Sequence, residues 1–206
     1  MINKGKFITF EGGDGAGKST HIKRLTSYLE DRGYEVVFIR EPGGTAIGEK
    51  IRDILLGNEN AEMCSQAELL LFEASRAQIT KQIIKPALER GAIVLADRFY
   101  DSSVAYQGYA RGLKIDDIKQ LNMFATDYLV PDMTILMVSS VDESLERATK
   151  DGADRIESAG VEFQKKVMDG FKQIAEAEPD RFKLVRLQDS KDDTFNLILE
   201  KLKELF

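Results

Sequence analysis

Five short apolar runs, separated by longer segments with helical periodicity, constrain the fold of this chain more than any other feature. The runs are rich in β-branched and aromatic residues, and they are apolar nearly throughout rather than at alternate positions. Strands of this kind belong to a parallel sheet that is buried on both faces. The sequence therefore predicts an α/β fold of three layers, a five-stranded parallel sheet with helices on both faces. The runs are Phe7 to Phe10, Val36 to Ile39, Ile93 to Ala96, Met133 to Val138 and Leu184 to Leu187.

The longer segments between these runs have the periodicity of helices. Ile22, Leu25 and Leu29 share one face of a predicted helix, and Gly33 is a typical helix stop. There is no internal repeat, no low-complexity segment and no linker rich in Pro, Gly or Ser. The 206 residues are therefore expected to form a single domain, 1–206. Two further helical segments run from about Ser65 to Glu89 and from Thr194 to Leu205.

Composition excludes several classes of function. With 29 basic and 35 acidic residues the net charge is −6, which argues against a broad nucleic-acid surface but permits local basic clusters. One cysteine, Cys64, and one histidine, His21, cannot build Cys/His dyads or His-rich metal sites. A single cysteine fits a reducing compartment. No apolar run has the length of a membrane span, so we expect a cytoplasmic protein that binds neither a membrane nor a nucleic acid polymer.

The first apolar run leads into EGGDGAGKST, Glu11 to Thr20, which contains the pattern G-x-x-x-x-G-K-[ST]. This is a P-loop, whose backbone N–H groups and following helix N-terminus bind phosphates. Lys18 is expected to reach the β and γ phosphates, and Ser19 to offer its hydroxyl to Mg²⁺. We therefore predict a site for ATP and Mg²⁺ rather than a glycine-rich turn with a solvated lysine. The ATP-binding residues expected here are Gly12, Gly13, Asp14, Gly15, Ala16, Gly17, Lys18, Ser19 and Thr20.

Asp97 and Arg98 follow the third apolar run directly. An acid after an apolar strand, in a chain with a P-loop, has the form of a Walker B element, so Asp97 is expected to hold Mg²⁺ together with Ser19. The guanidinium of Arg98 would place lasting positive charge and fixed donors next to transferring phosphates. The alternative is a plain ion pair between Asp97 and Arg98.

Phe72 and Arg76 are four residues apart in a predicted helix, so they project from one face. The phenyl ring can stack on a base while the arginine donates to the edge of the same base. Because arginine only donates, it recognises the O4 carbonyl of thymine or uracil and not the amino group of cytosine. In the alternative interpretation Phe72 belongs to the core and Arg76 is a solvated helix residue.

These motifs give the chain a resemblance to a known family. The run LADRFYDSSVAYQ, from Leu95 to Gln107, closely matches the signature of thymidylate kinases, and the resemblance covers nearly the whole chain in order and spacing. It implies the P-loop nucleoside monophosphate kinase fold. It also implies transfer of phosphate from ATP to dTMP with Mg²⁺, in a homodimer. The other matching segments are FEGGDGAGKST, REPGGTAIGEKIR from Arg40 to Arg52, LLFEASRAQ from Leu70 to Gln78, and DRIE from Asp154 to Glu157.

The resemblance also assigns residues to the sugar and base of the acceptor. It implies that Asp14 accepts a hydrogen bond from the 3′-hydroxyl and that Tyr106 packs against the 2′ carbon. It places Ser103 and Gln107 near the base. A tyrosine in such a segment is as often simply part of the core.

For the acceptor phosphate the resemblance is to bacterial members of the family. Gly43 and Gly44 occupy the region in which eukaryotic-type enzymes carry an arginine, so Arg52, together with Arg98, is expected to meet this phosphate. Arg40 is expected to be structural.

A basic stretch, ERATKDGADRIES, runs from Glu146 to Ser158. A short lid at about 147–160 would neutralise charge on the transferring phosphoryl group and exclude water when it closes. Because Gly15 stands where some relatives carry an arginine, the resemblance makes Arg155 the catalytic lid arginine and places Arg147 against adenine. The alternative is a solvated charged loop.

The expected catalytic residues are thus Lys18, Asp97, Arg98 and Arg155. Two other functions stay open at this point. One is a different nucleoside or nucleotide kinase on the same fold, and the other is a non-catalytic regulator that binds a nucleotide. The complete set of Asp97, Arg98 and Arg155 favours a kinase over a regulator.

Overall fold

The computed structural model describes residues 5–139 and 155–205 of the chain. Its centre is a five-stranded sheet in the order β2-β3-β1-β4-β5, and every neighbouring pair of strands is parallel. The strand that leads into the P-loop, β1, is central. The fifth strand begins at Phe182, earlier than the predicted Leu184. The strands are β1 (Lys6–Glu11), β2 (Val36–Arg40), β3 (Ile93–Asp97), β4 (Met133–Val138) and β5 (Phe182–Arg186).

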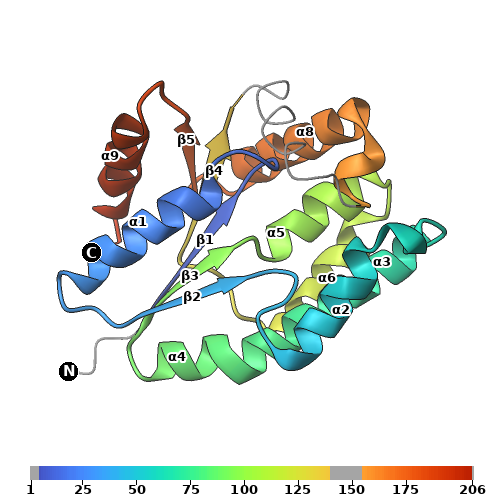
Figure 1. Cartoon of the computed structure of the whole chain (residues 1–206), viewed down its shortest axis with the longest axis horizontal. Helices are drawn as coiled ribbons and strands as arrows, with labels where there is room; N and C mark the ends of the chain where they lie inside the picture. The colour runs from blue at the N-terminus through green and yellow to red at the C-terminus, as the bar shows by residue number, and fades with distance from the viewer. Residues whose placement is uncertain (1–4, 140–154, 206) are drawn as a thin grey trace.

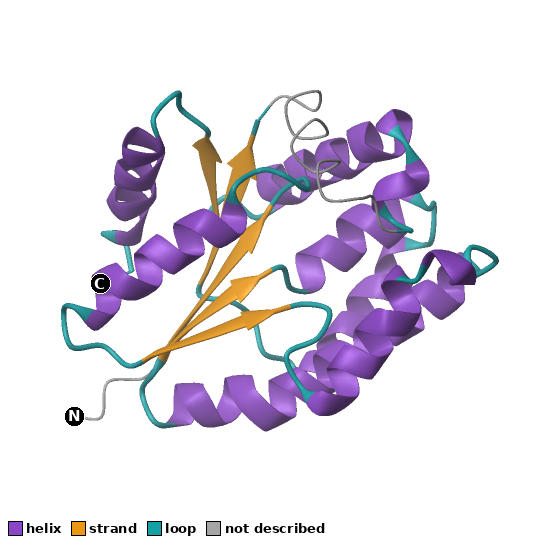
Figure 2. Cartoon of the chain, viewed as in Figure 1, coloured by secondary structure: helices purple, strands orange, loops and turns teal. Residues whose placement is uncertain are grey.

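Helices cover both faces of the sheet, which confirms the three-layer α/β prediction (Figure 1). One face carries α1 (Lys18–Glu30) and α9 (Lys191–Leu202). The other side carries a larger group of helices; Figure 2 shows all helices in purple and the strands in orange. This group consists of α2 (Ala46–Leu56), α3 (Ser65–Ile79), α4 (Lys85–Glu89), α5 (Tyr100–Ser103), α6 (Ile115–Thr126) and α8 (Val161–Ala177).

Successive side chains of the central strand, β1, pack into the core on opposite faces of the sheet. Ile8 and Phe10 pack in the cluster with α1 and α9, whereas Phe7 packs in the cluster that includes α4. Because successive residues of a strand point to opposite faces, Glu11 lies on the same side as Phe7. The central strand is buried on both faces, which explains why it is apolar nearly throughout.

The predicted helical segment from Ser65 to Glu89 is confirmed as α3 and α4 joined by a π-helical turn, η2 (Thr80–Ile84). A second π-helical turn, η3 (Val104–Ala110), follows α5 at the sequence that resembles the family signature. Such turns are common at functional sites. Two short 3₁₀ helices are η1 (Asn58–Asn60) and η5 (Glu157–Ala159).

Helix ends differ slightly from the predictions. The first helix stops at Glu30, and Gly33 lies in the following turn at a φ of 85°. The last helix begins at Lys191 rather than Thr194, because the hydroxyl of Ser190 accepts from the backbone N–H groups of the first turn.

The carboxyl ends of all five strands lie along one edge of the sheet, since the strands are parallel. The P-loop follows β1, Glu41 follows β2 and Arg98 follows β3 at this edge. Ligands of open parallel sheets bind at such an edge. Within the described residues, no helix combines the length and the apolar character that crossing a membrane requires.

Candidate active site

The P-loop turns sharply between β1 and α1. Gly12 has a φ of 132°, and a Cβ atom there would collide with the carbonyl oxygen of Met137 on β4. Gly17 is left-handed at a φ of 77° and caps α1, which begins at Lys18. Glycine adopts these conformations without the clash that any side chain would cause. The loop therefore ends at the N-terminus of α1, where backbone N–H groups and the helix dipole favour a phosphate.

Lys18 lies across this loop. Its Nζ donates to the carbonyl oxygens of Gly12 at 3.2 Å and Gly13 at 2.9 Å. Burial lowers the pKa of the Lys18 ammonium, and the nearby charge of Arg98 lowers it further. Lys18 as a whole is 7% exposed, and its amine is held at the loop where the predicted triphosphate would lie.

Ser19 and Asp97 meet at the start of α1. The hydroxyl of Ser19 donates a 2.6 Å hydrogen bond to Oδ2 of Asp97. Both are hard oxygen ligands, which suit Mg²⁺. Among the described residues there is no group of three or more His, Cys, Asp or Glu side chains that would form a closed metal cage. Two protein oxygens at a phosphate site fit an ion that takes its other ligands from phosphates and water.

Arg98 begins the segment after β3 in a left-handed conformation, with a φ of 70°. Its backbone N–H donates to the carbonyl of Phe10 at 3.0 Å, and its Nη2 donates to Asp14 at 2.5 Å. The ion pairs formed by Arg98 in the described chain are with Asp14 and, at 4.0 Å, with Glu11. The alternative prediction, that Asp97 and Arg98 simply form an ion pair with each other, is therefore wrong.

Glu11, at the end of β1, fixes the turn that follows Arg98. Its carboxyl accepts from the backbone N–H of Phe99 at 2.8 Å and from the hydroxyl of Ser102 at 2.6 Å. Burial raises the pKa of Glu11 to about 7, with a further contribution from the charge of Asp101. Ser102 also accepts from Nη1 of Arg98 at 3.2 Å, so the backbone turn and the guanidinium are fixed together.

Asp14 projects from the P-loop toward Arg98 and Tyr106. Its Oδ2 accepts from the hydroxyl of Tyr106 at 3.3 Å. Burial raises the pKa of Asp14, but the charges of Arg98 and Lys18 outweigh it and hold the pKa below its ordinary value. Asp14 is therefore ionised at neutral pH. The guanidinium of Arg98 lies 5.1 Å from the centre of the Tyr106 ring.

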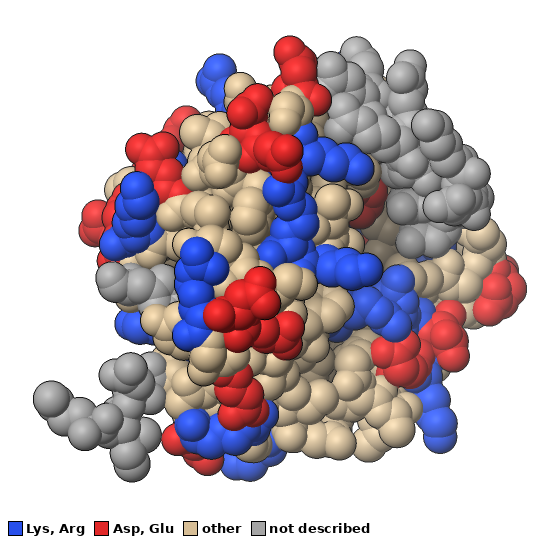
Figure 3. Space-filling model, turned by 60° about the vertical axis from the view of Figure 1, so that its left-hand side comes forward, with Lys and Arg blue, Asp and Glu red and all other residues tan. Residues whose placement is uncertain are grey.

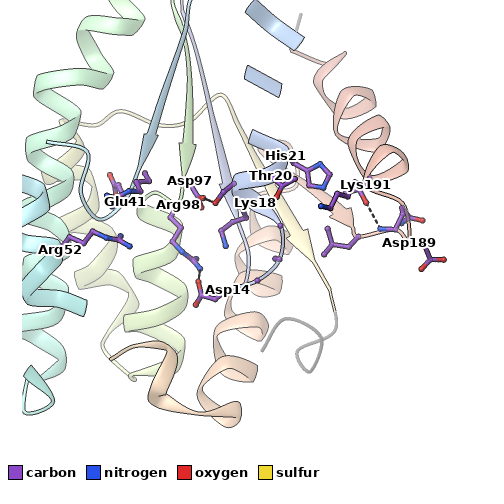
Figure 4. A pocket seen from close by; sticks show the side chains of 18 residues that line it. Asp14, Lys18, Thr20, His21, Glu41, Arg52, Asp97, Arg98, Asp189 and Lys191 are labelled. Carbon is purple, nitrogen blue, oxygen red and sulfur yellow. Dashed lines mark hydrogen bonds and ion pairs between the residues drawn. The ribbon is translucent and has the colours of Figure 1, made fainter. Parts of the chain in front are cut away.

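Two cavities meet at these residues. The larger has a volume of about 680 Å³ and includes the P-loop from Asp14 to Thr20. The smaller has a volume of about 150 Å³ and is lined by Phe72, Ser103, Tyr106 and Gln107, among others. Figure 4 shows Arg98 and Asp14 between Arg52 on one side and Lys18 on the other. The residues that line both cavities are Asp14, Glu41, Arg52 and Arg98.

Basic side chains concentrate at the larger cavity although the chain is acidic overall. In the space-filling view, Lys and Arg side chains gather around a hollow near the middle of the face (Figure 3). Local positive charge of this kind concentrates an anionic ligand. The basic residues that line the larger cavity are Lys18, Arg40, Arg52, Arg98 and Lys191.

Phe72 and Arg76 take different places. Phe72 lines the smaller cavity, whereas Arg76, although described, is not in the wall of either cavity. Arg76 is 1% exposed and donates to Glu41 at 2.8 Å and to Ser103 at 2.9 Å. The interpretation of Arg76 as a solvated helix residue is therefore wrong. The guanidinium lies behind Ser103 rather than at the cavity surface.

Glu41 and Glu73 hold Arg76, and neither was predicted as a site residue. Nε of Arg76 donates to Glu41, and Nη1 donates to Glu73 at 2.5 Å. Burial raises the pKa of Glu41 to about 7, although the charge of Arg76 opposes this. Glu41 directly follows the β2 strand, in REPGG, and this position at the carboxyl end of a parallel strand could have predicted it as a site residue.

Arg40 and Arg52 support the loop after β2. Arg40 donates to the carboxylate of Glu49 at 2.9 Å and to the carbonyl of Pro42 at 3.1 Å, which agrees with the structural role expected of it. Arg52 donates to the same carbonyl at 3.0 Å and lines both cavities.

Arg155 lies away from the P-loop in this structure. Its Nη2 donates to Glu68 at 2.6 Å, and its Nε donates to the carbonyl of Leu55 at 2.8 Å. Of the predicted lid, 155–160 are described, and Arg147 lies outside the described residues. The structure thus brings together the predicted residues from the P-loop, α2, β3 and η3. Arg155 lines neither cavity and instead contacts α2 and α3.

The residues at one end of the larger cavity were not predicted from the sequence. This end is formed by the segment after β5 and by His21 on α1. Because β5 is parallel to the other strands, its carboxyl end lies at the same edge of the sheet as the P-loop. This position could have predicted that the segment after β5 contributes to the site. The residues are His21, Leu187, Gln188, Asp189, Lys191 and Thr194.

Comparison with known proteins identifies the family of this chain. The family model described as thymidylate kinase matches residues 10–198. The chain belongs to the thymidylate kinase family. Since members of this family are phosphoryl transferases, the prediction of an enzyme with a nucleoside monophosphate kinase fold is confirmed.

Individual relatives cover almost the whole chain. A thymidylate kinase from Thermoanaerobacter sp. (strain X514) is 49% identical over 179 residues, 87% of this chain and 88% of that protein. Another, from Exiguobacterium sp. (strain ATCC BAA-1283 / AT1b), is 42% identical over 205 residues, 97% of both. The crystal structure of thymidylate kinase from Ehrlichia chaffeensis superimposes with a TM-score of 0.79 at 36% identity, covering 98% of each chain.

Proposed function

We propose that the chain transfers the γ-phosphoryl group of ATP to dTMP and releases ADP and dTDP. Membership of the thymidylate kinase family supports this reaction. The observation that carries it is the pair of cavities that share Asp14, Glu41, Arg52 and Arg98. A P-loop lies in the larger cavity, and an aromatic wall that includes Phe72 lies in the smaller. A triphosphate in one and a monophosphate in the other would meet at the shared residues.

The chemistry requires positioning and positive charge rather than a proton acceptor. The attacking atom is a phosphate oxygen of dTMP, which is already anionic at neutral pH, so no general base is needed. Lys18 lies at the P-loop, and Arg98 is anchored by Asp14 and Ser102 at the junction. Their fixed donors would stabilise the charge that spreads over the transferring group.

Ser19 and Asp97 are the residues that would hold Mg²⁺. Their oxygens are in hydrogen-bond contact at the start of α1, beside the larger cavity. When bound, the ion neutralises phosphate charge and favours one geometry of the triphosphate.

The smaller cavity is the proposed acceptor site. Phe72 would stack on the base, and Ser103 and Gln107 would contact its edge. Asp14 is ionised and faces Tyr106, which suits a carboxylate that accepts from a sugar hydroxyl. Arg52 lines both cavities, which supports its contact with the acceptor phosphate.

Arg76 is still proposed to recognise the base, and it donates to Ser103, which lines the smaller cavity. Its Nε donates to Glu41 and its Nη1 to Glu73 and Ser103, so these two nitrogens would contact the base directly only by exchanging a partner.

The lid stays a proposal, as does the organisation of the chain as one domain with a short lid at about 147–160. Arg155 is 8% exposed in its side chain and is bound to Glu68. It would leave this carboxylate and meet the transferring phosphoryl group when both nucleotides are bound. Arg147 is proposed to lie against adenine.

A homodimer is the proposed assembly. Large apolar side chains are exposed on α2, α3 and the end of α6, and α3 packs against both of the other helices. An apolar patch of this kind is typical of an interface between subunits. A cytoplasmic location is also proposed, from the family resemblance and the single free cysteine, Cys64. The exposed residues are Ile47, Ile54, Leu70, Phe124, Tyr128 and Val130.

A coupled assay of ADP release tests the function. The protein is given ATP and Mg²⁺ with dTMP, dUMP, dCMP, dGMP or thymidine in turn. We expect the highest kcat/KM with dTMP. Preferential turnover of dCMP or thymidine would identify a different kinase on this fold. Binding of ATP without ADP release above the ATP-only background for any acceptor would indicate a non-catalytic regulator.

A further inference from the structure

Glu68 on α3 is buried beside the smaller cavity and receives several hydrogen bonds. It is 1% exposed. Its Oε1 accepts from Nε2 of Gln107 at 2.9 Å, and its Oε2 accepts from Arg155 at 2.6 Å and from Arg111 at 3.2 Å. Nε of Arg111 also donates to Oε1 at 3.2 Å. Buried acids in proteins are usually paired in this way.

The partners of Glu68 keep it ionised. Burial raises the pKa of Glu68, but the hydrogen bonds from Gln107, Arg111 and Arg155 outweigh burial and hold the pKa below its ordinary value. An ionised carboxylate has no hydrogen to donate, so it accepts only. Whatever faces Glu68 must therefore present a donor.

Gln107 is oriented by this requirement. A glutamine amide has a donor end, the NH₂ group, and an acceptor end, the carbonyl oxygen. Since the NH₂ group faces Glu68, the carbonyl is directed to the other side of the amide. Gln107 is 1% exposed and lines the smaller cavity together with Phe72 and Ser103. The orientation of its amide therefore decides whether the cavity offers an acceptor or a donor at this point.

We propose that Glu68 is a positioning residue that fixes the amide of Gln107, so that the smaller cavity accepts a pyrimidine carrying an N3–H and disfavours cytosine. The inference rests on the proposed function, because it assumes that the base of the acceptor nucleotide lies in this cavity. It adds a specificity role for a residue that does not line the cavity itself.

The chemistry of the bases explains the selection. Thymine and uracil carry a hydrogen on N3, which donates to a carbonyl oxygen, whereas N3 of cytosine is an acceptor. An acceptor facing an acceptor leaves two buried polar groups unpaired, which is strongly unfavourable. Because thymine and uracil share the N3–H group, Glu68 should not affect the choice between them.

The substitution Glu68→Gln removes this constraint with little change of shape. A glutamine at this position can donate or accept, so Gln107 is free to turn its NH₂ group toward the cavity. We expect the ratio of kcat/KM for dTMP over dCMP to fall at least tenfold, while the ratio for dTMP over dUMP stays within about twofold. Glu62→Gln is the matched control because Glu62 is exposed, just before α3. Both ratios should stay unchanged in that variant.

A second variant makes the test independent of the stability of the first. Gln107→Met removes both ends of the amide and leaves Glu68 with its arginine partners. The ratio for dTMP over dCMP should fall in this variant too. In the double variant, Glu68→Gln should cause no further fall, since Glu68 acts through Gln107. Thermal unfolding of each variant, measured with and without ATP, shows that the fold and the larger cavity are intact.

The outcomes separate this inference from the proposed function. If the unaltered protein prefers dTMP but Glu68→Gln or Gln107→Met leaves the dTMP to dCMP ratio unchanged, the inference is overturned while the function stands. A proportional loss with dTMP, dUMP and dCMP in Glu68→Gln also overturns it, because a purely structural role predicts that result. Failure of the unaltered protein to use any acceptor contradicts the proposed function.

Discussion

The hydroxyl of Ser19 donates to the carboxylate of Asp97 at 2.6 Å, although the two residues come from different segments at the edge of the sheet. Ser19 lies in the first turn of α1, and Asp97 is the last residue of β3. Since β1 and β3 are neighbours in the sheet, the end of β3 reaches the beginning of α1. The parallel sheet thus brings the two proposed Mg²⁺ ligands together.

Replacing Asp97 tests this relationship. Asp97→Asn keeps the size of the side chain and its capacity to accept from Ser19, but it loses the negative charge that would hold Mg²⁺. We expect kcat to fall about 10²- to 10³-fold and half-maximal activity to require more Mg²⁺. Rates measured over a range of Mg²⁺ concentrations decide the matter. An unchanged Mg²⁺ dependence would contradict the assignment of Asp97.

Arg155 tests the proposed lid. Arg155→Gln removes the charge that would meet the transferring phosphoryl group, so we expect kcat to fall about 10²-fold while dTMP alone binds within a few fold of the unaltered protein. Isothermal titration with dTMP and steady-state kinetics give the two values. Lys172→Gln on α8 is the control, because Lys172 is exposed and pairs with Asp169 on the same helix. A kcat in Arg155→Gln equal to that of this control would exclude a catalytic role.

Glu11 makes stability depend on pH. Its pKa is raised from 4.5 to about 7, so between these values the folded state holds a proton that the unfolded state has lost. The contribution of Glu11 to the free energy of unfolding is fully present below pH 4.5 and is lost as the pH rises through about 7. Glu11→Gln removes this dependence. The stability of the variant relative to the unaltered protein should therefore rise from pH 5 to pH 8, by on the order of 3 kcal/mol at most.

Urea unfolding at several pH values measures this difference. The exposed acid Glu30 on α1 provides the control variant, Glu30→Gln, for which the difference should stay nearly constant. A difference for Glu11→Gln that does not change over this range would show that Glu11 is ionised in the folded protein.

The apolar patch on α2, α3 and α6 predicts a homodimer that a single charge disrupts. Phe124 is 82% exposed on α6, and Phe124→Glu would place a charge in the proposed interface. Sedimentation velocity should show a dimer for the unaltered protein and a monomer for the variant. Val161→Glu is the control, because Val161 is also exposed but lies at the start of α8. A monomeric unaltered protein would contradict the proposed assembly.

Local sequence signals were sufficient for the sheet and the phosphate loop. Each strand is an apolar run in its own right, and the P-loop combines glycines at fixed spacing with Lys18 and Ser19. These features depend on residues close together in the chain. A further prediction was possible from the parallel sheet. Ligands bind at the carboxyl edge of such a sheet, and the end of β5 lies at this edge, so Gln188 and Lys191 could have been predicted as cavity residues.

Contacts between distant segments were not predictable from one sequence. Helical spacing correctly placed Phe72 and Arg76 on the same helix, yet it does not show that Glu41, from the end of β2, reaches Arg76. That contact keeps the guanidinium behind Ser103. The role of Glu68 was hidden for the same reason, since its partners Gln107 and Arg155 lie far along the chain.

The central claim is that ATP and the acceptor nucleotide occupy the two cavities at once and meet between Asp14 and Arg98. A compound that joins adenosine to thymidine through an oligophosphate tests this most directly, because one molecule would fill both cavities and gain affinity from the linkage. We predict that it binds with one compound per chain and inhibits competitively against both ATP and dTMP. Competition against only one of the two substrates would contradict the account.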